Sequence, residues 1–238
     1  MNWRVFFSLV EKITLMNLSE SSPRVELSCG LSIGYEGRLA CVDGRDEGIV
    51  LEGGTHYLLA RNGRGKTTLL KTLAGVLNPL GGDYSCEGRC QYLSEDLTFD
   101  RELPAKAIFK AFLKKGKYAE AIDLAQTLEL DVKKPYGQLS TGNKRKVALL
   151  VAEFSVQDQG HDVLLLDEPF TGLDTFSREV FQKRWNHNQD GVLRLVSCHP
   201  DFDSMEVNSS VLITDGKIVH VAGDGEAQCW GELKNQLN

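Results

Sequence analysis

A glycine-rich loop at residues 60–68, Ala-Arg-Asn-Gly-Arg-Gly-Lys-Thr-Thr, holds residue types suited to binding phosphate groups. Where such a loop joins a strand to a helix, successive backbone N–H groups point inward and the helix N-terminus adds about half a positive charge. The Lys66 ammonium can then reach the β- and γ-phosphates of a nucleotide, and the Thr67 hydroxyl can join the shell of a Mg²⁺ ion. The other residues expected to cradle the phosphates are Arg61, Asn62, Gly63, Arg64, Gly65 and Thr68.

The first position of this loop departs from the pattern G-x-x-x-x-G-K-[ST], because Ala60 stands where glycine is usual. A methyl group there is tolerated if φ is negative, but it strains the loop if φ is positive. We predict the unstrained case. The alternative for the whole motif is a chance Gly-Lys-Thr-Thr in a surface loop, since motifs of this length produce false positives.

Two carboxylates, Asp167 and Glu168, follow the apolar run Leu164-Leu165-Leu166 further along the chain. Asp167 at the end of a buried strand can provide a second Mg²⁺ contact. Glu168, displaced into the cleft, can polarise a water molecule for attack on the γ-phosphate. Taken alone, this segment is better explained as a polar strand end, with Pro169 stopping the strand. Together with the glycine loop it predicts a nucleotide site.

The segments that must position these residues predict an α/β core, in which strands alternate with helices. The apolar run before Asp167 is nearly continuous, as expected for a parallel strand covered on both faces. The predicted strands lie at 25–35, 37–43, 55–60, 90–94, 162–167, 192–197 and 209–223, the last with an Asp215-Gly216 turn inside it. A helix is predicted at 66–77, ended by Asn78-Pro79.

Residues 104–130 predict two amphipathic helices that interrupt this alternation and form a helical insertion. We expect the apolar stripe of each helix to pack in the core. The stripes consist of Ala105, Ile108, Phe109, Phe112 and Leu113 in the first helix, and of Tyr118, Ala121, Ile122, Ala125 and Leu128 in the second.

The composition is that of an ordinary soluble globular protein, with 42% hydrophobic and 25% charged residues among 238. The net charge of −6 argues against non-specific binding of nucleic acid. No apolar run approaches the roughly 18 residues that a membrane-spanning helix needs. Six cysteines are scattered along the chain. Cys86 and Cys90 suggest half of a metal site, but no second Cys or His pair at ligand spacing completes it, so free thiols are expected.

Residues 1–20 predict a helical N-terminal extension with an aromatic face that includes Trp3, Phe6 and Phe7. Charges follow the short apolar patch, so we do not interpret it as a signal peptide. An aromatic face of this size must pack on this chain, on a partner or on a membrane surface. Its basic residues are too few for strong membrane anchoring, which leaves packing on the protein itself or docking to a partner.

The motifs, in this order, resemble those of the ABC family of ATPases over about residues 25–225. The loop at 60–68 resembles the family's phosphate loop, and Leu164–Pro169 resembles its Mg²⁺ strand and catalytic glutamate. The resemblance implies a P-loop NTPase core with an antiparallel β subdomain and an inserted α-helical subdomain at about 96–145, within a single domain at 21–238. It also implies ATP and Mg²⁺ as cofactors, and a head-to-tail dimer with two ATP molecules between the protomers.

Further residues acquire roles only through this resemblance. Ser140 and Gly142 lie in Leu-Ser-Thr-Gly-Asn, which is similar to the family's signature, and would approach the γ-phosphate held by the partner protomer. Asp174 belongs to the loop after the Mg²⁺ strand, and His199 stands where the family has its switch histidine. Tyr35 resembles the aromatic residue that stacks on adenine. The alternatives are an ordinary surface or core histidine for His199, and core packing for Tyr35.

Three positions besides Ala60 depart from the family pattern. Thr141 and Asn143 replace a glycine and the glutamine of the signature, and Glu95 stands at the position of the glutamine that contacts Mg²⁺ or water. Gln91 lies earlier and is expected to belong to the strand. None of these changes removes Lys66 or the other main site residues, so we predict a working site with a modified loop and signature.

The resemblance implies an ATPase subunit that powers a separate membrane protein, which holds it at the cytoplasmic face of the membrane. Among such subunits, it favours those of small exporters, including the haem-export type. One alternative is a soluble, non-transport ABC ATPase, such as a scaffold for iron–sulfur cluster assembly. Another is a nucleic-acid-linked ATPase of the family, but those proteins usually carry two cassettes or long coiled coils, and this chain is acidic.

Overall fold

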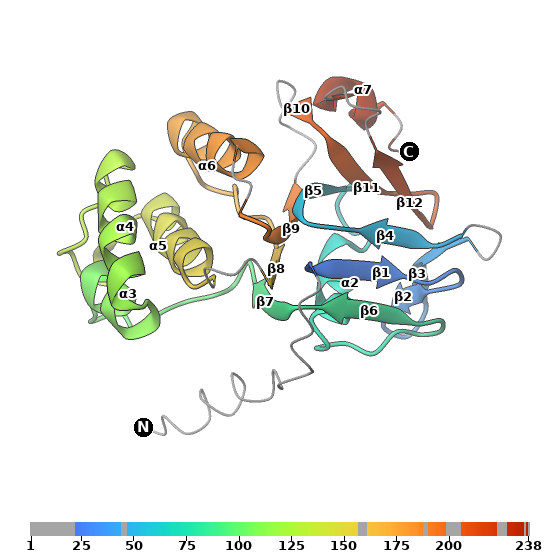
Figure 1. Ribbon diagram of the computed structural model, residues 1–238, viewed down its shortest axis with the longest axis horizontal. Helices are drawn as coiled ribbons and strands as arrows, with labels where there is room; N and C mark the ends of the chain where they lie inside the picture. The colour runs from blue at the N-terminus through green and yellow to red at the C-terminus, as the bar shows by residue number, and fades with distance from the viewer. Residues whose placement is uncertain are drawn as a thin grey trace.

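The computed structural model describes residues 22–43, 47–156, 161–187, 190–198, 206–222, 228–235 and 237. Our expectations for the N-terminal extension at 1–20 and for His199 lie outside these residues. The described part has the predicted α/β architecture, in which helices pack against a large mixed sheet (Figure 1). No described helix combines the length and the apolarity needed to cross a membrane.

The large sheet has eight strands in the order β2-β3-β12-β11-β5-β9-β8-β7. The strands β11, β5, β9, β8 and β7 run parallel, so their carboxyl ends meet at one edge of the sheet. The strands are β2 (Ser32–Gly34), β3 (Arg38–Val42), β5 (Gly54–Leu59), β7 (Arg89–Leu93), β8 (Asp162–Leu166), β9 (Leu193–Cys198), β11 (Ser209–Thr214) and β12 (Lys217–Ala222). The hairpin β11–β12 turns at Asp215-Gly216, as predicted, with both residues at positive φ.

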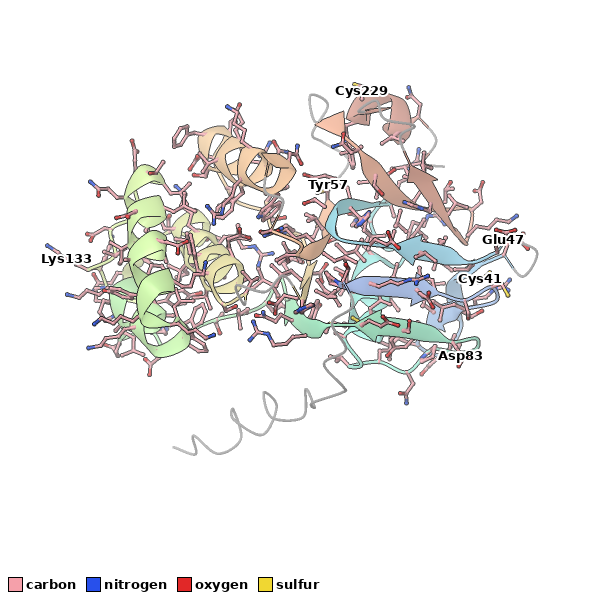
Figure 2. All side chains as sticks on the ribbon, viewed as in Figure 1. Cys41, Glu47, Tyr57, Asp83, Lys133 and Cys229 are labelled. Carbon is pink, nitrogen blue, oxygen red and sulfur yellow. The ribbon has the colours of Figure 1, made fainter. Side chains whose placement is uncertain are left out.

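The central strands of this sheet are buried on both faces. Along β5, Tyr57 (labelled in Figure 2) and Leu59 join one core cluster, while Leu58 and the following Ala60 join a second cluster on the opposite face. All five residues of β8 and all six of β9 are buried. This double cover explains why the strands appear in the sequence as nearly continuous apolar runs.

A separate antiparallel sheet has the strand order β4-β1-β6. Its strands are β1 (Arg24–Leu27), β4 (Ile49–Leu51) and β6 (Tyr84–Glu87), and a further pair is formed by β10 (Glu206–Val207) and β13 (Gln228–Cys229). The sequence predicted no strand at β4 or β6. The single strand predicted at 25–35 is wrong, because this segment holds β1 and β2, which belong to different sheets.

The helix after the glycine loop, α2, spans Lys66–Leu73 and ends earlier than predicted. Gly75 adopts a left-handed φ of 68°, and the N–H groups of Gly75 and Val76 bond to the carbonyl groups of Thr72 and Lys71. This is a glycine-based helix end, so Gly75 rather than Asn78-Pro79 stops the helix.

Three helices lie between β7 and β8 in the chain and to the left of the sheets in Figure 1. They are α3 (Ala105–Phe112), α4 (Lys115–Thr127) and α5 (Thr141–Phe154), with a short 3₁₀ turn, η1 (Tyr136–Gln138), before α5. Both predicted helices at 104–130 are therefore present. The expectation that Phe112 packs in the core is wrong, because this side chain is 46% exposed and makes only an edge contact with Phe99. The chain continues through α6 (Thr175–His187) and ends with α7 (Trp230–Lys234).

Candidate nucleotide site

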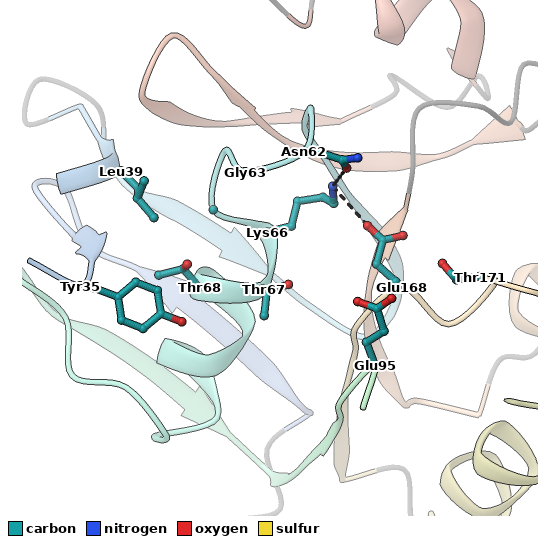
Figure 3. A pocket seen from close by; sticks show the side chains of 11 residues that line it. Tyr35, Leu39, Asn62, Gly63, Lys66, Thr67, Thr68, Glu95, Glu168 and Thr171 are labelled. Carbon is teal, nitrogen blue, oxygen red and sulfur yellow. Dashed lines mark hydrogen bonds and ion pairs between the residues drawn. The ribbon is translucent and has the colours of Figure 1, made fainter. Parts of the chain in front are cut away.

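A cavity of about 520 Å³ opens at the carboxyl edge of the large sheet, where β5 passes into α2 (Figure 3). In Figure 3, Tyr35 and Leu39 lie on one side of the cavity and Glu95 and Glu168 on the other. Lys66 lies between them, with its ammonium directed toward Asn62 and Glu168. The complete lining consists of Tyr35, Leu39, Asn62, Gly63, Gly65, Lys66, Thr67, Thr68, Glu95, Glu168 and Thr171. Segments far apart in the sequence thus converge on one site.

The glycine loop has a backbone suited to an anion. Gly63 and Gly65 have φ angles of 74° and 110°, a region that other residues rarely adopt. Gly65 caps the N-terminus of α2 without any side-chain hydrogen bond, so the helix presents its first backbone N–H groups to the cavity. Arg61 and Arg64 belong to the same loop but are exposed and do not line the cavity.

Ala60 fits its position without strain, as predicted. The only described non-glycine residues with positive φ are Glu129, Glu168 and Asp215, so the φ angle of Ala60 is negative. The Ala60 methyl group is fully buried in the second core cluster. Alanine is therefore compatible with the loop, because the backbone at this position has a negative φ angle, which any residue can adopt.

Ala60→Gly is expected to lower the free energy of unfolding by a few tenths to about 1 kcal/mol, because it frees the unfolded chain and removes a buried methyl group. Thermal melts with and without ATP measure this change. A higher melting temperature together with tighter ATP binding would instead show that Ala60 strains the loop.

The Lys66 side chain crosses the cavity mouth and is only 7% exposed. Its Nζ atom donates to the Ala60 carbonyl oxygen at 3.1 Å and to Asn62 Oδ1 at 3.5 Å, and it lies 3.2 Å from Glu168 Oε1. At present this ammonium contacts two neutral oxygens and one carboxylate oxygen. A phosphate group that enters the loop would offer it several charged oxygens, which are stronger acceptors than the neutral ones.

Asp167 has a buried carboxylate whose hydrogen bonds come from hydroxyl groups. Thr67 Oγ1 and Ser197 Oγ donate to Asp167 Oδ1 at 3.1 and 3.0 Å, and Tyr92 Oη donates to Oδ2 at 3.0 Å. Burial and the adjacent Asp167 carboxylate raise the pKa of Tyr92, so this phenol remains a proton donor. A buried carboxylate next to hydroxyl oxygens is the kind of oxygen donor set that Mg²⁺ takes, so the residues fit this ion.

Glu168 has a left-handed backbone with φ of 46°, which is unfavourable for a residue other than glycine. Two contacts hold this conformation: Ser197 Oγ accepts from the Glu168 N–H at 2.7 Å, and Arg145 donates to the Glu168 carbonyl oxygen at 2.6 Å. The left-handed turn takes the Glu168 side chain out of the strand direction and into the cavity, beside Lys66. Such local strain is typical of functional residues.

Arg145 on α5 is a site residue that the sequence analysis missed. Its guanidinium is buried and binds backbone carbonyl groups of two segments, one after β7 and one after β8. The acceptors are the carbonyl oxygens of Ser94, Glu95, Asp167, Glu168 and Pro169. Arg145 therefore ties α5 to the loop that carries Glu95 and to the turn that carries Glu168, although it points at no ligand position itself.

Glu95 and Tyr35 both line the cavity. Gln91 belongs to β7 and hydrogen-bonds Ser155, so it is Glu95 that reaches the cavity after the strand. Its carboxylate can serve as an additional oxygen ligand for Mg²⁺. Tyr35 is 58% exposed at the cavity rim. The alternative that Tyr35 packs in the core is thereby excluded, and its ring is accessible for stacking.

The signature residues do not line this cavity. Ser140 is exposed at the N-terminus of α5, where its hydroxyl accepts from the Asn143 N–H at 3.2 Å. Gly142 packs against backbone: a Cβ atom there would lie 2.5 Å from the Gly172 carbonyl oxygen. Glycine is thus required at position 142 because the backbone of Gly172, in the same chain, packs directly against it.

The Asp174 carboxylate is likewise bound by residues of its own chain. Its Oδ1 accepts from the Ser177 N–H at 2.7 Å at the start of α6, and its Oδ2 lies 2.9 Å from Lys146 Nζ on α5. The hydrogen bonds from Ser177 and Lys146 hold the pKa of Asp174 well below its usual range.

Comparison with known proteins gives a consistent picture. A family profile described as ABC transporter matches residues 48–171. An uncharacterized ABC transporter ATP-binding protein of Methanocaldococcus jannaschii is 30% identical over 182 residues, which are 72% of this chain and 68% of that protein. The cytochrome c biogenesis ATP-binding export protein CcmA of Zymomonas mobilis is 35% identical over 149 residues, which are 60% of this chain and 64% of that protein.

Solved structures share the fold. The structure of an ATP-binding subunit of an ABC transporter superimposes with a TM-score of 0.63, covering 83% of this chain and 89% of that one at 20% sequence identity. At this identity the likeness concerns the fold alone.

Proposed function

Because this chain belongs to the ABC transporter family and shares its ATP-binding domain, we propose that it binds and hydrolyses ATP and thereby powers a separate membrane subunit. The observation that carries the proposal is the convergence of Lys66, Thr67 and Glu168 on one cavity, with Asp167 hydrogen-bonded to Thr67 beneath it. These side chains come from segments about 100 residues apart, and each has the type that phosphoryl transfer requires.

In this proposal the triphosphate lies in the glycine loop. The N-terminal N–H groups of α2 and the Lys66 ammonium bind its oxygens, and Tyr35 stacks on the adenine ring. Thr67, Asp167 and Glu95 would hold Mg²⁺, which neutralises charge on the β- and γ-phosphates when bound. Glu168 accepts a proton from the attacking water. His199 is proposed as the switch histidine.

The proposed active assembly is a head-to-tail dimer. Ser140 and the N-terminus of α5 are exposed and lie outside this chain's own cavity, which supports a role at the nucleotide of a partner protomer. The positive end of the α5 dipole would face the γ-phosphate there. Homo- and heterodimers both satisfy this arrangement.

The relative from Zymomonas mobilis favours an exporter as the transport system, since its name includes cytochrome c biogenesis and export. This chain spans 64% of that relative's length. We propose that the transport system is an exporter of haem-export type. A soluble ABC ATPase in cluster assembly is the second candidate. Co-purification that depends on detergent, together with a multi-spanning protein, supports the transport role, whereas recovery with soluble partners alone contradicts it.

Lys66→Ala is expected to weaken ATP binding by about 2 to 4 kcal/mol, because a cation that faces two phosphates is lost from a largely enclosed site. Titration of the purified chain with ATP measures the change in Kd. Lys71→Ala, at the other end of the same helix, is the control and should leave Kd unchanged. Unaltered affinity in Lys66→Ala would mean that the glycine loop is not the phosphate site.

A further inference from the structure

The chain passes from one sheet to the other at Gly88. The strand β6, which ends at Glu87, is an edge strand of the three-stranded sheet, and β7, which begins at Arg89, is an edge strand of the eight-stranded sheet. Gly88 has φ of 117°, and a Cβ atom there would lie 2.7 Å from the His161 carbonyl oxygen. Only glycine fits this bend, which therefore sets how the two edge strands meet.

The bend brings two thiols together. Cys86 and Cys90 stand two residues before and after Gly88, their side chains pack against the same core cluster, and the two thiols interact with each other. In an extended strand, residues four apart would be about 13 Å from each other. The contact thus arises from the bend and not from sequence spacing alone.

The position of this pair permits chemistry. Both side chains are only partly buried against the second core cluster, and Cys90 lines a cavity of about 420 Å³. By contrast, Cys198 is completely buried, and burial raises its pKa strongly. Neither Cys86 nor Cys90 takes part in the nucleotide site described above, so that site leaves the thiol pair unexplained.

We propose that Cys86 and Cys90 form a redox-active dithiol, which a low-molecular-weight disulfide converts into an intrachain disulfide across the junction of the two sheets. The two sulfur atoms must close to about 2.05 Å. Because each cysteine lies on an edge strand, no further strand among the described residues blocks this movement on the outer side of its sheet.

The reaction is a pair of exchanges. The Cys86 thiolate attacks oxidised glutathione, forms a mixed disulfide and releases one glutathione thiolate. Cys90 then loses its proton to solvent and attacks Cys86 Sγ, which releases the second glutathione. Two electrons pass from the protein thiols to glutathione. The interaction between the two thiols lowers the pKa of Cys86 and raises that of Cys90, so in this proposal Cys86 is the attacking and Cys90 the resolving thiol.

The experiment treats the purified, reduced full-length chain with oxidised glutathione, alkylates the remaining thiols, and maps all six cysteines by mass spectrometry. We expect Cys86 and Cys90 to lose two hydrogen atoms together, roughly tenfold faster than glutathione adds to exposed Cys29. Cys41 and Cys229, both labelled in Figure 2, are internal controls.

Two variants assign the order of the steps. Cys90→Ser should trap glutathione on Cys86, and Cys86→Ser should slow the reaction of Cys90. Alkylation of both cysteines under conditions in which Cys29 is already modified would overturn the proposal. Stable glutathione adducts on wild-type Cys86, without the internal disulfide, would do so as well. The mapping of the wild-type chain alone decides the matter if a variant does not fold.

Discussion

Glu168→Gln is expected to slow ATP hydrolysis by roughly 10²- to 10⁴-fold while ATP still binds. The amide has the shape of the carboxylate but cannot accept the proton of the attacking water. Binding should persist because Lys66 is unchanged and gains freedom to face the phosphates when its ion pair with Glu168 is removed.

Phosphate release under saturating ATP measures turnover, and size-exclusion chromatography with ATP detects the dimer that the variant should accumulate. Glu120→Gln, an exposed position on α4, is the matched control and should retain full activity. Wild-type turnover in Glu168→Gln would exclude Glu168 as the general base.

Glu153→Ala is expected to lower the free energy of unfolding by about 3 to 5 kcal/mol. Glu153 lies near the end of α5, is 3% exposed, and accepts from Trp185 Nε1 at 3.0 Å and from Arg184 Nε at 2.8 Å. It also lies 3.3 Å from the fully buried Arg194 of β9. Removal of this carboxylate would leave buried donors, one of them charged, without their shared acceptor.

Urea unfolding followed by tryptophan fluorescence measures this loss. The control is Glu179→Ala, which breaks an exposed pair with Lys183 and should change stability by less than about 0.5 kcal/mol. The double variant Glu153→Leu, Arg194→Leu should recover much of the stability, because apolar side chains of similar volume need no partners. If Glu153→Ala changed the free energy of unfolding as little as Glu179→Ala, the contacts of Glu153 with Trp185 and Arg194 would not stabilise the fold.

The elements that build the phosphate loop could be predicted because their signals are local. The apolar run of β8, the glycine loop and the amphipathic pattern at 104–130 each depend on residues close in the sequence. The end of α2 was misplaced because Gly75, not the later proline, adopts the left-handed conformation. Phe112 follows the helical stripe, yet among the described residues no element packs over it closely enough to bury it.

The supporting residues of the site could not be predicted, because their roles depend on contacts between distant segments. Ser197 looks like an ordinary polar residue at a strand end, but the parallel pairing of β8 with β9 places it beside Asp167. Arg145 looks like one of several basic residues on a helix, and only the packing of α5 against the sheet edge reveals its carbonyl partners. A polar residue at the carboxyl end of a neighbouring parallel strand is the one signal that could have singled out Ser197.

The backbone contact between Gly142 and Gly172 has a consequence for cooperativity. No flexible side chain separates the start of α5 from the loop that follows Glu168, so these two segments must shift together. In the proposed dimer the first segment faces the partner's nucleotide, and the second belongs to the chain's own site. Occupancy of one site would then change the affinity of the other, and thermodynamic linkage requires the same factor in both directions. Binding curves of ATP to this protein should accordingly depart from those of independent, identical sites.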